Sequence, residues 1–140
     1  MTKIIKIAII GLGQVGNYLY RELNLKKKNI EIKSGKKIQI SAVSAKNRNK
    51  KRKYKINKKI FYTDPIKIIK KIKPDILFEV IGQSDGISKK VVETALRNQI
   101  HVITPNKALI SKHGDYLSKL AEDNNVNLEF EASVAGGIPI

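Results

Sequence analysis

The chain has 140 residues, of which 41% are apolar and 6% aromatic, enough for one folded domain but not for a cofactor domain together with a full substrate domain. No stretch approaches the roughly 20 uninterrupted apolar residues that a membrane helix needs, so no membrane partner is expected. The sequence has no cysteine, which excludes disulfides, thiolate metal ligands and a cysteine nucleophile. Its first residues do not resemble a secretory signal, and a cytoplasmic location is expected.

The formal net charge of +16 raises the question of a nucleic-acid partner, because a basic face gains free energy by releasing counterions from phosphates. Fifteen of the 28 Lys and Arg residues lie between Lys26 and Lys59, interleaved with Asn and Ile, whereas the expected core strands carry almost no charge. This distribution is typical of a solvated surface. Nucleic-acid binding by the basic segment 46–59 is therefore disfavoured, but it stays as an alternative.

Apolar strands alternate with helix-compatible segments along the chain. The first strand is expected over residues 3–10, followed by a glycine-rich turn and a helix from Gln14 to about Lys27. A polar connection containing Ser34 and Gly35 leads to a second strand over 38–44. The basic segment that follows is expected to be a loop.

The next elements carry recognisable start and stop signals. IFYT forms a short strand, and Asp64 is expected to cap a helix that has Pro65 in its first turn and ends at Pro74. The nearly continuous apolar run over 75–81 is typical of a parallel strand covered on both faces. The helix after it carries a buried stripe made by Val91, Val92, Ala95 and Leu96.

A strand over HVIT, a helix over about 115–124 and a strand over 127–133 complete the series. Strands that alternate with helices predict an α/β fold, a Rossmann-type doubly wound parallel sheet that is incomplete at its C-terminal end. Residues 1–140 are expected to form one dinucleotide-binding domain, without a substrate domain.

GLGQVG at residues 11–16 matches the pattern GxGxxG and lies directly between the first strand and the first helix. In that position the first glycine makes the tight turn, the second lets the backbone approach a pyrophosphate and the third allows close helix packing. The alternative is a plain strand-to-helix turn. We expect dinucleotide binding, with contacts from Gly11, Leu12, Gly13, Gln14, Val15 and Gly16.

The end of the second strand decides between NAD and NADP. An acidic side chain there would bind an unmodified ribose, but residues 44–48 read SAKNR and contain no carboxylate. Lys46 and Arg48 suit a 2′-phosphate, so NADP is preferred and NAD stays possible. The alternative is that both cations merely open the basic loop.

HVITPNKALISKHG at 101–114 places Lys107 just past the carboxyl end of a strand, where open α/β sheets bind ligands. A lysine there can hold an anionic or polarised oxygen, although the spacing alone also fits an ordinary surface lysine. His101 and His113 are isolated, without Asp or Cys partners, and are expected to be structural or surface residues. The final segment, FEASVAGGIPI, contains a glycine pair that fits either a ligand-binding turn or a domain-linking turn.

Taken in order, GLGQVG, FEVIGQSDG, HVITPNKAL and FEASVAGGIPI resemble the signature segments of the homoserine dehydrogenase family over essentially the whole chain. The last two are the specific ones. The resemblance implies NAD(P)-dependent hydride transfer between L-homoserine and L-aspartate 4-semialdehyde, in the biosynthesis of threonine, methionine and isoleucine. It also implies that Lys107 is catalytic and contacts the nicotinamide side of the cofactor, and that Ser84 contacts the cofactor. A sodium ion is implied near GGIPI, held largely by backbone carbonyls of Glu131, Val134, Gly136 and Ile138.

Three features depart from the family pattern. Pro105 stands where the family commonly has Ala, and Gln83 stands where Gly is frequent. The third is that the substrate domain implied by the resemblance, with its second lysine and substrate-binding acids, would lie beyond residue 140. The chain alone is therefore expected to show little or no turnover, and the full-length enzyme is expected to be a homo-oligomer that acts on small-molecule substrates.

Two alternatives of other kinds stay open. One is another amino-acid-pathway dehydrogenase with a similar first domain, although the catalytic Cys or His-rich motif that it would need is not seen. The other is a dinucleotide-binding regulatory module without chemistry.

Overall fold

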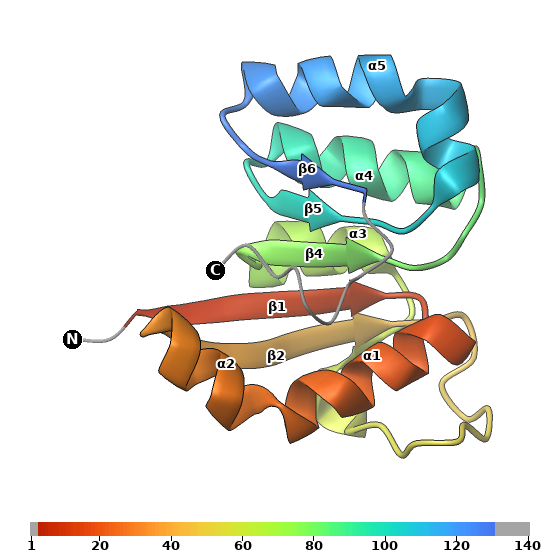
Figure 1. Cartoon of the computed structure of the whole chain (residues 1–140). Coiled ribbons are helices and arrows are strands. Elements are labelled where there is room, and N and C mark those ends of the chain that lie inside the picture. Colours follow the sequence, from red (N-terminus) through yellow and green to blue (C-terminus); the bar gives the residue numbers. More distant parts are fainter. Residues whose placement is uncertain (1–2, 131–140) are drawn as a thin grey trace.

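One sheet of six parallel strands runs through the computed structural model, which describes residues 3–130 (Figure 1). The spatial order is β3-β2-β1-β4-β5-β6, so the winding reverses between β1 and β4. This order is that of the Rossmann fold, in which ligands bind at the carboxyl edge beside the reversal. The predicted fold class is confirmed. The strands are β1 (Ile4–Ile10), β2 (Lys37–Ser44), β3 (Phe61–Tyr62), β4 (Ile76–Glu79), β5 (His101–Ile103) and β6 (Leu128–Glu129).

Helices cover both faces of the sheet (Figure 1). One face carries α1 (Gln14–Leu25) and α2 (Lys27–Ser34), and the other carries α3 (Pro65–Lys67), η2 (Ile68–Ile72), α4 (Ile87–Arg97) and α5 (Lys107–Asp123), while η1 (Lys58–Ile60) precedes β3. Along β1, Ile7 and Ile9 pack toward α1, whereas Ala8 and Ile10 pack toward α4. Burial on both faces explains why β1 is apolar at nearly every position.

The predicted stripe of α4 is confirmed, since all four of its apolar residues are fully buried. The helix after β5 is longer than expected. It begins at Lys107 instead of near residue 115, because the Asn106 side chain accepts a hydrogen bond from the Leu109 amide and caps it there. Gly114 and its polar neighbours lie inside this helix, and they obscured its first two turns in the sequence.

The prediction of a polar connection before the second strand was wrong, because α2 forms there. This helix buries none of its residues, so it lacks the apolar stripe by which helices are recognised. It ends at Gly35, which adopts a left-handed conformation with φ of 72°. The Glu31 carboxylate accepts a hydrogen bond from the Ile38 amide and ties the helix to β2.

Two smaller differences concern β4 and the helix before it. Asp64 caps that helix through the Ile66 amide, and the helix stops at Lys73, directly before Pro74, as predicted. The difference is that its second part, η2, is π-helical and ends on a residue with a positive φ of 51°. The π-helical turn buries Ile68 and Ile69 under the sheet. Strand β4 ends at Glu79, two residues before the predicted end.

Among the described residues, none of the helices combines the length and apolar character needed to cross a bilayer.

The packing of α4 can be tested by truncating Leu96, which is fully buried between the sheet and α5. Leu96→Ala is expected to lower the free energy of unfolding by about 2–5 kcal/mol, because it leaves a cavity. Ile32→Ala is the matched control: Ile32 is 78% exposed on α2, and its truncation should change stability by less than about 0.5 kcal/mol. Urea unfolding measures both, and equal effects would contradict this packing.

Candidate functional site

The turn between β1 and α1 brings three stretches of backbone together without intervening side chains. Gly11 has a φ of 107°, and its amide donates to the carbonyl of Ser44 at 2.8 Å. A Cβ on Gly11 would lie 2.8 Å from the carbonyl carbon and oxygen of Val80, and one on Gly16 would lie 1.8 Å from the Gly11 carbonyl oxygen. The roles predicted for these two glycines therefore match the local packing, because any side chain would displace α1 or the end of β4.

Gly13 differs from the other two glycines, because a Cβ there would meet no atom within 4 Å. It is the N-cap of α1, and the first turn of α1 contains no acidic residue and has no side-chain cap. The first N–H groups of a helix have no partner within the helix, and they carry a partial positive charge. The backbone at Gly13 is thus open to an anion that approaches the start of α1.

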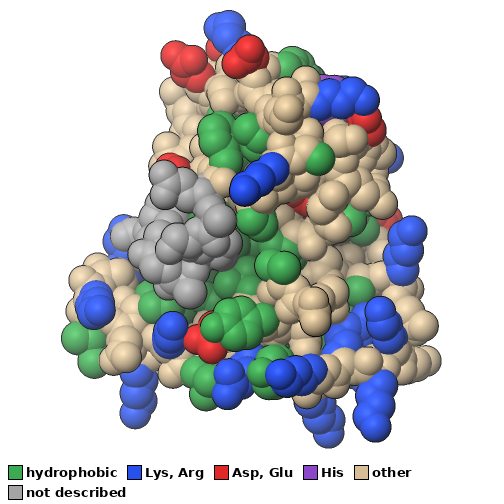
Figure 2. Space-filling view, turned by 45° about the vertical axis from the view of Figure 1, so that its right-hand side comes forward, with side chains coloured by type: hydrophobic (Ala, Val, Ile, Leu, Met, Phe, Trp, Pro, Cys, Tyr) green, Lys and Arg blue, Asp and Glu red, His purple; other side chains and the backbone are tan. Residues whose placement is uncertain are grey.

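A crevice of about 800 Å³ lies beside this turn, at the carboxyl edge of the sheet. Figure 2 shows this edge turned toward the viewer, with apolar side chains in the middle of the face and Lys and Arg around its lower part. The lining comes from the ends of β1, β2, β3 and β4 and from the loops that follow them. Its residues are Ile10, Gly11, Leu12, Gly13, Ser44, Ala45, Lys46, Thr63, Asp64, Pro65, Val80, Ile81, Gln83 and Ile87.

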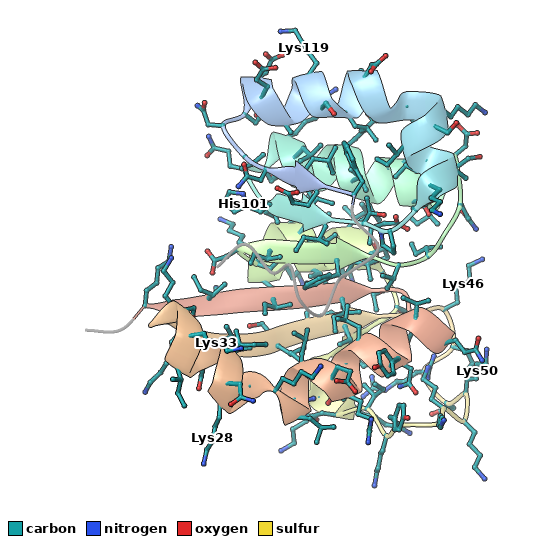
Figure 3. All side chains as sticks on the ribbon, in the orientation of Figure 1. Lys28, Lys33, Lys46, Lys50, His101 and Lys119 are labelled. Atoms are coloured by element: carbon teal, nitrogen blue, oxygen red, sulfur yellow. The ribbon has the colours of Figure 1, made fainter. Side chains whose placement is uncertain are left out.

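Lys46 and Asp64 are the charged residues of the lining, and Asp64 already serves as the cap of α3. Lys46 is exposed and extends at the carboxyl edge of the sheet, well apart from Lys28 and Lys33 on α2 and Lys119 on α5 (Figure 3). The labelled lysines point in different directions. A cation is thus available at the end of β2, as the sequence predicted.

Arg48 does not line this crevice. Its guanidinium donates to the carbonyl of Lys58 at 3.0 Å and lies 6.0 Å from the centre of the Phe61 ring. The structure therefore brings Lys46 and the glycine turn together but holds Arg48 on the basic loop.

The basic loop is docked on α1. The buried Asn17 side chain makes two hydrogen bonds with the backbone of Tyr54, one to its amide and one to its carbonyl, both 2.8 Å long. The Arg52 guanidinium donates to the carbonyls of Asn47, Lys50 and Leu12, and the last of these belongs to the glycine turn. A second cavity, of about 510 Å³, lies between loop residues 50–54 and the start of α1, and Gln14 and Val15 line this cavity instead of the crevice.

Glu79, at the end of β4, is a fully buried carboxylate that the sequence analysis did not single out. One oxygen accepts from the amides of Ile81 at 2.9 Å and Gly82 at 3.1 Å. The other accepts from the Thr104 hydroxyl at 2.6 Å and the Asn106 amide group at 3.2 Å. The sequence carried one signal for this residue: it is an acid in an otherwise apolar strand. A carboxylate at such a position is buried and needs several hydrogen-bond partners.

Lys107 is the first residue of α5 and is exposed. It follows the buried Asn106, which caps the helix and also donates to the carbonyl of Gln83 at 2.7 Å. The position of Lys107 at the carboxyl edge agrees with the prediction. Asn106 and Thr104, which fix that position, were not identified from the sequence.

Asp85 joins the loop after β4 to α5. It accepts hydrogen bonds from Ser84 at 3.3 Å and from Lys112, and one of its oxygens lies 2.7 Å from Nε2 of His113. The bond from Lys112, followed by that from His113, lowers the pKa of Asp85 from its usual 3.8 to about 2. Ser84 thus lies in a loop that is held against α5.

The expectation that His113 is isolated was wrong, because the fold brings it to an aspartate 28 residues earlier. His101 has a structural role, as predicted: its Nδ1 accepts a hydrogen bond from the Asn127 amide at 3.0 Å. The residues expected to bind sodium, Glu131, Val134, Gly136 and Ile138, lie outside the described part of the chain.

A parallel sheet in this strand order, with a glycine turn that opens onto its reversal point, defines a dinucleotide-binding domain of the Rossmann class. Residues 11–131 match the family model described as the NAD-binding domain of homoserine dehydrogenase. The chain therefore belongs to the homoserine dehydrogenase family, whose members are oxidoreductases that use a nicotinamide dinucleotide.

Individual relatives agree with this assignment. The chain is 36% identical over 138 residues to homoserine dehydrogenase of Neisseria gonorrhoeae and 34% identical to that of Bacillus subtilis. Each match covers 99% of this chain but only 31% and 32% of the relative, so the chain spans about a third of their length. The crystal structure of S. aureus homoserine dehydrogenase at pH 7.5 superposes with a TM-score of 0.86 and 35% identity, covering 94% of this chain and 34% of that one.

The Asp85 contacts predict how stability depends on pH. A carboxyl group whose pKa is lowered by folding stabilises the protein above its unfolded-state pKa, and it loses this contribution as the pH falls through its folded-state pKa. Wild type should therefore exceed Asp85→Asn in stability at about pH 5, and the difference should shrink as the pH falls from 3.8 toward 2.

Urea midpoints at several pH values measure this difference. Lys112→Met removes the contact that lowers the pKa most, so the shrinkage should be weaker in that background. A difference that stays constant down to pH 2 would contradict the assignment.

Proposed function

We propose that this chain binds NADP(H) in the crevice beside the glycine turn, as the cofactor part of an enzyme that interconverts L-homoserine and L-aspartate 4-semialdehyde. The observation that carries the proposal is the open backbone of Gly13 at the uncapped start of α1. Phosphates bind well at such a helix start, because free N–H groups and the helix dipole both favour negative charge. The residues present thus fit the pyrophosphate of a dinucleotide.

The proposed preference for NADP over NAD follows from the end of β2. Lys46 lines the crevice there, and no acidic residue occupies positions 44–48. A carboxylate at that place would accept hydrogen bonds from an unmodified ribose, whereas an ammonium group attracts a 2′-phosphate. Arg48 is the weaker candidate, because its guanidinium is engaged with the carbonyl of Lys58.

Lys107 is proposed as the group that moves the proton at the substrate oxygen. It is the first residue of α5, and the preceding Asn106 donates to the carbonyl of Gln83 in the loop that follows β4. When bound, the nicotinamide supplies hydride exchange with a carbonyl carbon. A lysine near that carbon can hold the oxygen as its charge changes, and it can donate or accept the proton.

Further parts of the proposal rest on the family resemblance. They are a sodium ion held near Glu131, Val134, Gly136 and Ile138, a cofactor contact by Ser84, a substrate domain with a second lysine, a homo-oligomeric full-length enzyme and a cytoplasmic location. The pathway role in the synthesis of threonine, methionine and isoleucine belongs with them.

Dinucleotide binding can be tested with Gly13→Asp. The added carboxylate would stand at the start of α1 and repel the pyrophosphate, so the dissociation constant for NADPH should rise by about tenfold or more. Thermal unfolding should change little, because the side chain enters open space. NADPH fluorescence measures binding, and Asn29→Asp on exposed α2 adds the same charge elsewhere as a control. Undiminished binding by Gly13→Asp would refute the proposal.

The 2′-phosphate contact can be tested with Lys46→Ala. Loss of one charge-assisted hydrogen bond should weaken NADPH by about tenfold and leave NADH within about twofold. Lys33→Ala, which removes an exposed lysine on α2, should affect neither cofactor (Figure 3). Parallel losses for NADPH and NADH in Lys46→Ala would show that this lysine does not recognise the phosphate.

A further inference from the structure

Glu79 connects the two loops that meet at the carboxyl ends of β4 and β5. Its Oε2 accepts from the amides of Ile81 and Gly82, which belong to the loop after β4. Its Oε1 accepts from the side chains of Thr104 and Asn106, which belong to the junction between β5 and α5. One carboxylate therefore fixes both loops at once.

Within residues 3–130, no Lys, Arg or His side chain forms an ion pair with Glu79. Its two oxygens instead accept from four hydrogen-bond donors, two of them backbone amides. A buried carboxylate is costly to keep unless such donors are held in place. Each donor that leaves weakens the remaining set, so the two loops are expected to keep one arrangement.

Asn106 extends this arrangement to Lys107. Its side-chain NH₂ donates to Glu79 and to the carbonyl of Gln83, and its side-chain oxygen accepts from the Leu109 amide. The backbone amide of Asn106 donates to the Thr104 hydroxyl at 3.1 Å. The start of α5, and with it the backbone of Lys107, is thereby tied to the loop that lines the crevice (Figure 1).

We infer that Glu79 is a positioning residue that holds the β4 loop and Lys107 in register for the nicotinamide half of the cofactor. It acts through Thr104 and Asn106 and does not touch the ligand, because it is fully buried. The inference rests on the proposed function, which places the nicotinamide beside Lys107. Each half of the cofactor thus has its own support: the glycine turn holds the adenine and phosphate half, and Glu79 orders the loops around the nicotinamide half.

Two ligands separate the halves: NADPH, and 2′,5′-ADP, which contains the adenine half with its 2′-phosphate but no nicotinamide. Glu79→Gln keeps the side-chain shape, but its amide can accept at only one of the two atoms and faces donors at the other. We expect NADPH to weaken by about tenfold, measured by calorimetry, and 2′,5′-ADP to stay within about twofold. Glu93→Gln, an acid on α4 paired with Lys89, is the matched control and should leave both ligands unchanged.

A second pair of variants keeps the test decisive if Glu79→Gln does not fold. Thr104→Val removes the hydroxyl that donates to Glu79 and accepts from the Asn106 amide, and Thr104→Ser keeps it. Selective loss of NADPH in the valine variant, with recovery in the serine variant, would support the inference. A general loss of stability would not produce that pattern.

Equal weakening of NADPH and 2′,5′-ADP in Glu79→Gln or Thr104→Val would overturn the inference, and so would unchanged NADPH binding. If the wild-type protein binds neither NADPH nor 2′,5′-ADP, the proposed function is refuted, and this inference with it. Wild-type binding of both ligands, without selective loss in the variants, refutes the positioning role alone.

Discussion

The close approach of the first turn to the end of β4 is the constraint on which the rest of the site depends. Gly11 lies against the backbone of Val80, and the start of α1 lies against Gly11, with no room for a side chain at either contact. This contact sets where α1 points and places its uncapped amides over the point at which the sheet reverses its winding. The crevice is a consequence of this arrangement, because a larger residue would close it or tilt the helix.

Two neighbouring parts of the carboxyl edge, the glycine turn and the ends of β4 and β5, are supported by different kinds of interaction. Around the glycine turn, backbone packs directly on backbone, and the decisive feature is the absence of side chains. At the ends of β4 and β5 the decisive feature is a buried carboxylate with four donors. Packing of the first kind resists displacement, whereas a buried hydrogen-bond network selects one arrangement and penalises partial loss.

The fold and the first half of the site could be predicted because their signals are local. A glycine pattern between an apolar strand and a helix can be read from adjacent residues, and the buried stripe of α4 repeats with helical spacing. Helix α2 could not be predicted because it buries no residue and therefore shows no apolar stripe. Its one local signal is Gly35, whose left-handed conformation ends the helix. The start of α5 was missed because its cap is a side chain that the buried network orients.

The second half of the site could not be predicted, because its partners are distant in the sequence. Glu79 and Asn106 are separated by 27 residues, and Asp85 and His113 by 28. Neither pair follows a periodicity that one sequence can reveal. The sequence shows that a carboxylate interrupts an apolar strand, but only the fold shows which donors surround it.

Asn17 has a consequence for the thermodynamics of ligand capture. Through two hydrogen bonds with the backbone of Tyr54, it anchors the basic loop to α1. Chain ordering that is completed during folding does not have to be repeated at each association event. The conformational entropy lost in ordering the loop backbone is thus part of the folding free energy. It does not oppose the binding of an anion at this face.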